Sequence, residues 1–155
     1  YMINTDCFGE RSFVYWRDSS AAKQSLALFR QHSTVAHLLP ADVFYFSGIS
    51  LAILSLEDRT YLFALIKELK AQGVQIVFDP NYRPALWPDA EICRANFDQA
   101  YALSDIALPG LDDHKVLYGS SSADEVLAQL QRQFWHDLKH RLDLLALQPN
   151  ATCNL

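Results

Sequence analysis

The sequence lacks the features by which a chain usually binds nucleic acid or enters a membrane. Its formal net charge is −5, and no dense run of lysine and arginine offers the basic face that a phosphate backbone selects. No stretch approaches the roughly 20 apolar residues of a membrane span, and the first residues lack the charged-then-apolar layout of a signal peptide. We therefore expect a cytoplasmic protein with no nucleic-acid or membrane partner.

Side chains that suit a metal site or a disulfide framework are also scarce. The three cysteines, Cys7, Cys93 and Cys153, are far apart and odd in number, which favours reduced thiols. His136 and His140 stand at i and i+4, a metal-capable spacing on a helix, but no third ligand or general-base glutamate accompanies them. We expect a solvated helix face there and no metal ligand in this chain.

Familiar catalytic motifs are absent from the sequence as well. It contains no glycine-rich phosphate loop, no nucleophile elbow and no recognisable catalytic triad. Any chemistry has to be inferred from the positions of polar residues relative to the predicted strands.

The first 17 residues predict a β-hairpin. Residues 1–5 and 12–17 are rich in aromatic and branched side chains, and the connection between them contains Gly9. Alternation along the second strand puts Phe13, Tyr15 and Arg17 on one face and Trp16 on the other. An isolated hairpin is marginal in water, so we expect its faces to contact something else.

The middle of the chain predicts an α/β domain. Short apolar runs predict strands at residues 42–46, 74–78 and 105–109, separated by segments with helical spacing at about 55–73 and 89–103. The first helix has a capping pair, Ser55 and Asp58, and Gly73 can supply its left-handed exit. Strands that alternate with helices indicate a parallel sheet with right-handed crossovers, and a further helix is expected at about 112–117.

Polar residues follow each predicted strand. In open parallel sheets, ligands bind beyond the carboxyl ends of the strands. The segments expected to carry function are therefore 47–49, 79–83 and 109–113.

Arg17 is one candidate for binding an anionic ligand. A guanidinium can bind a carboxylate bidentately, and the neighbouring phenol of Tyr15 can add a hydrogen bond. The alternative is a solvated arginine on an edge strand.

Arg83 is the second candidate. Pro84 restricts Arg83 to extended geometry at the mouth of the expected crevice, while Asn81 and Tyr82 offer further donors and acceptors. The alternative is a loop in which Arg83 forms an ion pair with Asp79 or Asp89. We expect Trp87, which follows this loop, to pack in the interior.

Four segments, in this order, resemble the ribokinase-like (PfkB) carbohydrate kinase family. They are GERSFVYWRDSSAA, FYFSGISLAILS, VFDPNYRPALW and DIALPGLDDHKVLYG, and the resemblance covers residues 1 to about 130. Within the family, the second and third segments are similar to those of its sugar-acid kinases. The resemblance implies a ribokinase-like parallel sheet flanked by helices, with a β-hairpin lid at 1–17, an incomplete core at 18–130 and a divergent tail at 131–155.

The resemblance also implies an activity. Members of this kind transfer a phosphoryl group from ATP, with Mg²⁺, to the terminal hydroxyl of 2-dehydro-3-deoxygluconate. The implied substrate-binding residues are Tyr1, Tyr15, Trp16, Arg17, Gly48 and Ile49. The implied ATP- and phosphate-binding residues are Asn81, Tyr82, Arg83, Gly110 and Asp113, of which Asp113 is similar to the acidic residue of a motif near phosphate and magnesium.

The chain also departs from the family pattern. Gly110 stands where many relatives have Asn or Ser, and the expected valine-rich strand after about Leu130 is missing. The family's N-terminal glycine-rich substrate loop and its Gly-Ala-Gly-Asp segment, whose aspartate is the general base, do not occur. We expect the central portion of a longer kinase that is inactive by itself.

Two other functions remain open at this stage. The acceptor of the kinase could be a neutral sugar or a nucleoside, which would give Arg17 no carboxylate to bind. The chain could instead be a non-catalytic binding module that forms a homo-oligomer through the exposed aromatic residues of its hairpin.

Overall fold

A computed structural model describes residues 2–16, 20–120 and 122–134 of the chain. These residues fall into two compact units, which divide between Ser33 and Thr34. The predicted boundary between lid and core at residues 17/18 lies at positions outside the described residues, as does most of the predicted tail, so both stay predictions.

The first unit begins with the predicted hairpin. Strand β1 (Met2–Thr5) pairs antiparallel with β2 (Arg11–Val14), and Gly9 in the connecting loop has φ +85°. The second strand ends at Val14 and does not reach residue 17 as predicted, because Val14 is already opposite Met2, the first residue of β1. A 3₁₀ turn, η1 (Ala21–Gln24), and helix α1 (Ser25–His32) follow.

The second unit contains the predicted parallel sheet. Strands β3 (Val43–Ser47), β4 (Gln75–Asp79) and β5 (Ile106–Ala107) lie in the order β3-β4-β5, and both pairings are parallel. The register places Ser47 opposite Asp79 and Phe78 opposite Ala107. The fold class expected from the sequence is therefore confirmed, although β5 is shorter than predicted.

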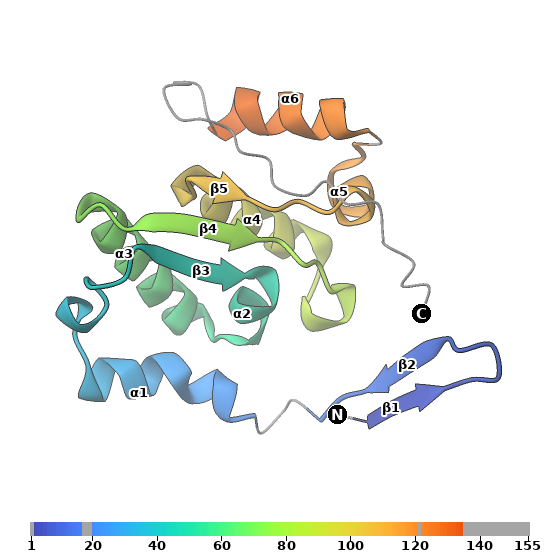
Figure 1. Cartoon of the computed structure of the whole chain (residues 1–155), viewed down its shortest axis with the longest axis horizontal. Coiled ribbons are helices and arrows are strands. Elements are labelled where there is room, and N and C mark those ends of the chain that lie inside the picture. The colour runs from blue at the N-terminus through green and yellow to red at the C-terminus, as the bar shows by residue number, and fades with distance from the viewer. Residues whose placement is uncertain (1, 17–19, 121, 135–155) are drawn as a thin grey trace. The chain divides into compact units, whose positions relative to one another are not determined.

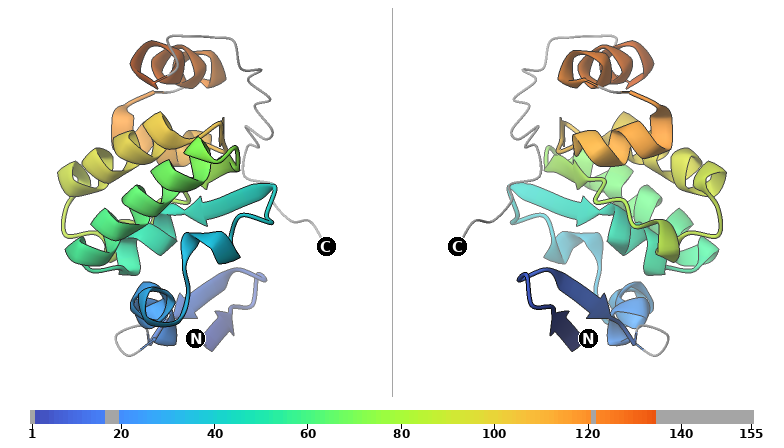
Figure 2. Two further views of the ribbon diagram at one scale, coloured as in Figure 1. Left: turned by 90° about the vertical axis from the view of Figure 1, so that its left-hand side faces the viewer. Right: turned by 90° about the vertical axis from the view of Figure 1, so that its right-hand side faces the viewer.

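Two long helices cover one face of this sheet (Figure 1). Helix α3 (Leu56–Ala71) connects β3 to β4, and α4 (Ala90–Leu103) connects β4 to β5. The hydroxyl of Ser55 accepts a hydrogen bond from the Asp58 amide at 3.1 Å, and Gly73 has φ +89°, as the predicted cap and exit require. Figure 2, seen along the edge of the sheet, shows the two helices side by side on one side of the strands.

Shorter elements complete the second unit. They are the 3₁₀ turns η2 (Val35–His37) and η3 (Pro84–Leu86) and the helices α2 (Gly48–Ile53), α5 (Leu111–Tyr118) and α6 (Ala123–Phe134). Helix α5 confirms the prediction at 112–117, whereas α1 and α2 were not predicted.

The core of the second unit is aromatic. Phe97 of α4 lies edge-on to Phe78 of β4, to Tyr82 and to Trp87, with ring centroids 5.4, 6.3 and 5.7 Å apart. Edge-to-face pairs of this kind add to the stabilisation from apolar burial. Trp87 is buried, as predicted, and the loop after β4 is thereby fixed onto α4.

Within the described residues, none of the helices is both long enough and apolar enough to cross a membrane.

Candidate functional site

The candidate site is formed by the loops that leave the carboxyl ends of the three parallel strands. Gly48 follows β3, Asn81 to Arg83 follow β4, and Gly110 with Asp113 follows β5. The parallel order brings these three loops to one edge of the sheet, where the sequence predicted a ligand site.

Gly48 is required by the close approach of two loops. A Cβ atom at this position would lie 1.9 Å from the carbonyl oxygen of Pro80 and 2.6 Å from Cζ of Phe97. The glycine also begins α2, whose preceding residue Ser47 caps it by accepting a hydrogen bond from the Ser50 amide at 3.4 Å. The backbone at the ends of β3 and β4 is therefore packed too closely for any other residue.

A hydrogen bond joins the loops after β4 and β5. The backbone N–H of Tyr82 donates to Oδ2 of Asp113 at 2.9 Å, across 31 positions of sequence. Asn81, which precedes Tyr82, has φ +34°, a left-handed conformation that asparagine tolerates better than most residues. This turn aims the Tyr82 amide at the carboxylate, while the Tyr82 ring is buried against Phe97.

Opposing effects act on the pKa of the Asp113 carboxyl. Burial raises the pKa of its carboxyl above the usual range, while the Tyr82 amide and the positive charge of Arg83 lower it. The nearby carboxylates of Asp79 and Asp112 raise it further. A second positive charge at this carboxylate, such as a metal ion, would therefore be favoured electrostatically.

Arg83 lies on the exposed side of the same loop. Its Nη1 donates to the carbonyl oxygen of Tyr82 at 3.3 Å, and its backbone is extended at φ −130°, as the following Pro84 predicts. Arg83 is exposed at the edge where the three loops meet.

Asp79 and Tyr45 form a further polar pair. The Tyr45 hydroxyl donates to Oδ2 of Asp79 at 2.8 Å, and burial together with this carboxylate raises the pKa of Tyr45 to about 12. Tyr45 was not among the residues predicted from the sequence. The available signal was the period of two along the strands, which puts Tyr45 and Asp79 on one face of neighbouring strands.

The remaining predicted site residues do not belong to the 81–83 loop or to the loop after β5. Ile49 lies in the first turn of α2, and Tyr15 and Trp16 lie in the first unit, directly after β2, with Tyr15 stacked on Phe13 at 5.9 Å. Tyr1 and Arg17 lie outside the described residues, as do His136 and His140. The structure thus brings together Gly48, the 81–83 loop and Asp113, but does not test the residues predicted for the lid.

The described residues offer only a partial set of ligands for Mg²⁺. No group of three or more His, Cys, Asp or Glu side chains suited to a metal is present among them. One half-buried carboxylate, Asp113, fits a magnesium ion that takes its other ligands from phosphate oxygens and water.

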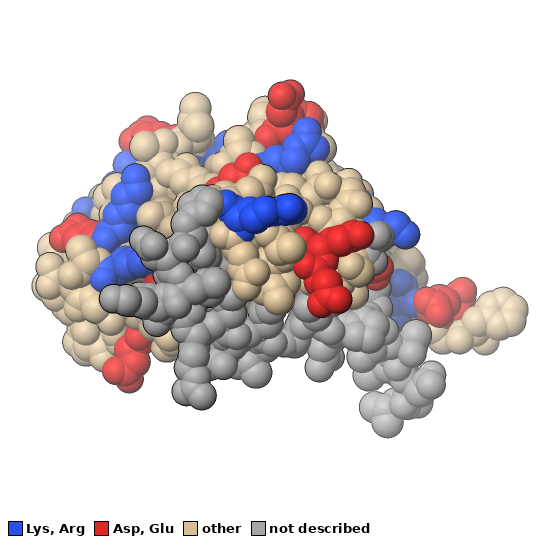
Figure 3. Space-filling model, turned by 90° about the horizontal axis from the view of Figure 1, so that it is seen from above, with Lys and Arg blue, Asp and Glu red and all other residues tan. Residues whose placement is uncertain are grey.

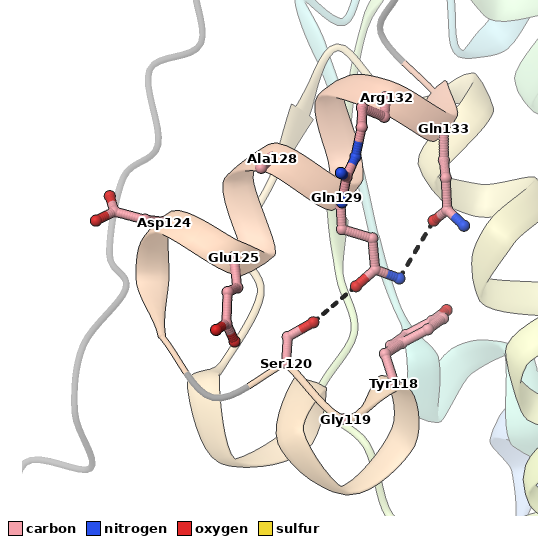
Figure 4. A pocket seen from close by; sticks show the side chains of 9 residues that line it. All are labelled: Tyr118, Gly119, Ser120, Asp124, Glu125, Ala128, Gln129, Arg132 and Gln133. Carbon is pink, nitrogen blue, oxygen red and sulfur yellow. Dashed lines mark hydrogen bonds between the residues drawn. The ribbon is translucent and has the colours of Figure 1, made fainter.

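A separate pocket of about 660 Å³ lies between α5 and α6 (Figure 4). Ser120 Oγ donates to Oε1 of Gln129 at 2.7 Å, and Nε2 of Gln129 donates to Oε1 of Gln133 at 3.2 Å. None of the predicted site residues lines it. On the face in Figure 3, basic side chains are interspersed with acidic ones.

The chain is similar to known carbohydrate kinases. The model of the pfkB family of carbohydrate kinases matches residues 1–136. The chain is 41% identical over 129 residues to the 2-dehydro-3-deoxygluconokinase of Escherichia coli K12, a match that covers 83% of this chain and 42% of that protein. The enzyme of the same name from Haemophilus influenzae is 39% identical over 132 residues, covering 85% and 42%.

A solved structure shares the fold. The fructokinase with bound ATP from Xylella fastidiosa superposes with a TM-score of 0.63 at 24% identity, over 84% of this chain and 40% of that one. The chain spans less than half the length of the relatives it matches. Because the family model matches most of its residues, the chain belongs to the pfkB family of carbohydrate kinases.

Proposed function

We propose that this chain is part of an ATP-dependent sugar-acid kinase that converts 2-dehydro-3-deoxy-D-gluconate into 2-dehydro-3-deoxy-6-phospho-D-gluconate. The observation that carries the proposal is the hydrogen bond from the Tyr82 amide to Asp113, which joins the two loops expected at the phosphates. The name shared by relatives that are 39–41% identical supports the choice of substrate.

The roles proposed for the residues follow from their charges. In the reaction, the terminal hydroxyl oxygen of the acid bonds to the γ-phosphorus, the bond from that phosphorus to the bridging oxygen of ATP breaks, and the hydroxyl proton leaves. Arg83, exposed at the end of β4, offsets negative charge on the transferring phosphoryl group. Asp113 takes part in holding Mg²⁺, which neutralises phosphate charge when it is bound.

The substrate would bind on the side of Gly48 and Ile49, which follow β3 at the edge of the sheet. The family resemblance adds Tyr1, Tyr15, Trp16 and Arg17 as substrate-binding residues, with Arg17 bound to the carboxylate. Arg17 belongs to the proposal on sequence grounds alone. Gly110 has no side chain, so the N-terminus of α5 would contribute to nucleotide binding through backbone amides alone.

Turnover is expected only from a longer protein that contains this chain. The sequence contains no Gly-Ala-Gly-Asp segment, so the proposed reaction has no general base here. A suitable test uses a chimera in which this chain replaces the matching segment of the Escherichia coli K12 relative. The chimera is expected to make the 6-phosphate with MgATP, whereas the purified 155-residue chain makes none; product from the chain alone would contradict this second statement.

A matched variant tests the substrate assignment. Replacing Arg17 with alanine in the chimera should raise the Michaelis constant for the sugar acid by about tenfold or more, because a bidentate charged contact is lost. The constant for MgATP should stay the same. An unchanged constant for the sugar acid would count against recognition of its carboxylate.

A neutral acceptor is the second candidate, favoured by the fold shared with a fructokinase. Under that alternative, the chimera would phosphorylate fructose or a nucleoside at least as fast as the sugar acid, and Arg17→Ala would have little effect.

A non-catalytic role in assembly is favoured by a different observation, the exposure of Phe13, Tyr15 and Trp16. Light scattering of the purified chain distinguishes it: a dimer that becomes a monomer in Trp16→Ser supports assembly through the hairpin, and a strict monomer at high concentration contradicts it.

A further inference from the structure

A groove of about 350 Å³ lies between α3 and α4, and no predicted site residue lines it. Helix α3 contributes Leu56, Arg59, Thr60, Phe63, Ala64 and Lys67, which recur at the three- and four-residue spacing of one helix face. Its volume is in the range of pockets that bind small molecules.

The groove is positively charged. Arg59 and Lys67 line it, and no carboxylate is among the lining residues. The Lys67 ammonium has no ion pair or hydrogen bond within the described ranges 2–16, 20–120 and 122–134. A small ligand that binds here would therefore gain from negative charge.

Arg59 packs on an aromatic ring, but one of its hydrogen-bond donors has no partner. Its guanidinium lies over the ring of Trp87, 5.6 Å from the centroid, which limits the conformations of the side chain. Its Nε is buried and has no hydrogen-bond partner. A buried donor without a partner is costly, so an acceptor supplied by a ligand would remove a penalty of the free protein.

The spacing of the two cations indicates the kind of ligand. They are eight residues apart on one helix, which is roughly 12 Å along the axis. Phe63 and Ala64 form an apolar stretch between them, and α4 adds the amides of Asn96 and Gln99 at the side. The amide nitrogen of Asn96 donates one hydrogen to the Ile92 carbonyl at 2.8 Å, which leaves its second N–H for a carboxylate of a ligand.

We propose that this groove binds a small ligand with two acidic groups at the ends of a short carbon chain. One acidic group pairs with Arg59 and the other with Lys67, and the carbon chain lies on Phe63 and Ala64. A single compact anion meets only one of the two cations, so the groove selects for length as well as charge. The site is independent of the proposed kinase reaction, since it shares no residue with it.

Adipate and hexanoate give a matched pair of probes, because they have six carbons each and differ by one carboxylate. The measurement is a titration of the isotope-labelled 155-residue chain, followed through the side-chain amide signals of Asn96 and Gln99 in nuclear magnetic resonance spectra. We expect the dissociation constant of adipate, read from these signals, to be at least tenfold lower than that of hexanoate. Added salt should weaken adipate binding. Signals of Gly48 and Asn81 should not follow the same curve.

Two variants complete the test. Lys67→Ala, at an exposed position, should weaken adipate binding about tenfold. Arg132→Ala removes the same charge from an exposed position on α6 and should leave the affinity unchanged. The inference is overturned if adipate causes no shift, if hexanoate binds equally well, or if Lys67→Ala binds adipate as tightly as the wild type.

Discussion

The two units of this chain achieve order in different ways. In the hairpin of the first unit, residues 2–16 are all exposed, and Trp16 keeps 69% of its surface in contact with solvent. In the second unit, Phe78 and Phe97 lie at 0% and 1% exposure inside an aromatic cluster. The second unit therefore has a hydrophobic core of its own, whereas the hairpin depends on backbone pairing and on whatever covers its aromatic residues.

This contrast is consistent with the roles proposed for the two units, a lid in the first and the phosphate-binding loops in the second. The loops proposed to bind the phosphates are fixed by Gly48, by Phe97 and by the bond from Tyr82 to Asp113. A lid that closes on a substrate has to be ordered weakly in its absence, because binding elements that move come from the less stable parts of a protein.

The largest difference between the units should appear when one aromatic residue is removed from each. Phe97→Ala should lower the free energy of unfolding by about 4 kcal/mol, because it leaves a cavity among three other rings. Trp16→Ala should change it by less than about 0.5 kcal/mol, since the side chain is exposed. Urea denaturation followed by circular dichroism measures both; similar losses would contradict the contrast.

Two glycines of the candidate site sharpen the comparison within the second unit. Gly48→Ala should cost about 3 kcal/mol, because its Cβ would overlap the Pro80 carbonyl and the two loops would have to separate. Gly110→Ala is the control: its Cβ would lie 3.6 Å from Asp113, at ordinary contact distance, and should cost less than about 1 kcal/mol. If both variants unfold at the same denaturant concentration, the loops are not closely packed.

His114 should give the second unit a stability that depends on pH. Its ring is buried, neither ring nitrogen has a hydrogen-bond partner, and burial lowers its pKa from 6.5 to about 4. The folded state therefore prefers the neutral ring, so its contribution is complete above pH 6.5 and is lost as the pH falls toward 4. The loss at low pH should approach roughly 3 kcal/mol.

The control for this prediction is His114→Phe, which keeps a ring stacked on Tyr118 but cannot be protonated. The difference between its stability and that of the wild type should change between pH 6.5 and 4. A constant difference over this range would show that the pKa of His114 is the same in the folded and the unfolded chain.

The smallest effect on stability is expected at Asp113. Because burial raises the pKa of its carboxyl, the folded state does not favour the charged form, and Asp113→Asn should alter the unfolding free energy by less than about 1 kcal/mol at pH 7. In the chimera, the same variant should lower kcat about 100-fold through loss of the charge proposed to hold Mg²⁺. Asp112→Asn, at an exposed neighbour, should change neither. A large loss of stability without a loss of kcat would assign Asp113 a structural role.

Local patterns in the sequence predicted the parts of the fold that local physics determines. The three strands, the Ser55 cap and the left-handed Gly73 follow from periodicity and backbone preference, and all are observed. Helix α1 was missed because none of its residues is buried, so it has no clear apolar face. The prediction of the second hairpin strand was too long because strand length depends on the partner strand.

The site could be located from the sequence, but its contacts could not. The rule that ligands bind beyond the carboxyl ends of strands identified the segments at 47–49, 79–83 and 109–113. The bond from Tyr82 to Asp113 and the approach of Gly48 to Pro80 join residues about 30 positions apart, and no local pattern specifies them. The family resemblance implied a phosphate-binding role for Tyr82, which stays a prediction, although its ring is buried against Phe97.

The central claim is that the loops after β4 and β5 form the phosphate side of a sugar-acid kinase site. The most direct measurement is the rate of phosphoryl transfer from MgATP to 2-dehydro-3-deoxygluconate by the chimera, compared with its Arg83→Ala variant at equal stability. The account predicts formation of the 6-phosphate, a kcat about 100-fold lower in the variant, and a much lower rate with fructose. Equal rates for the two proteins, or a faster reaction with fructose, would contradict it.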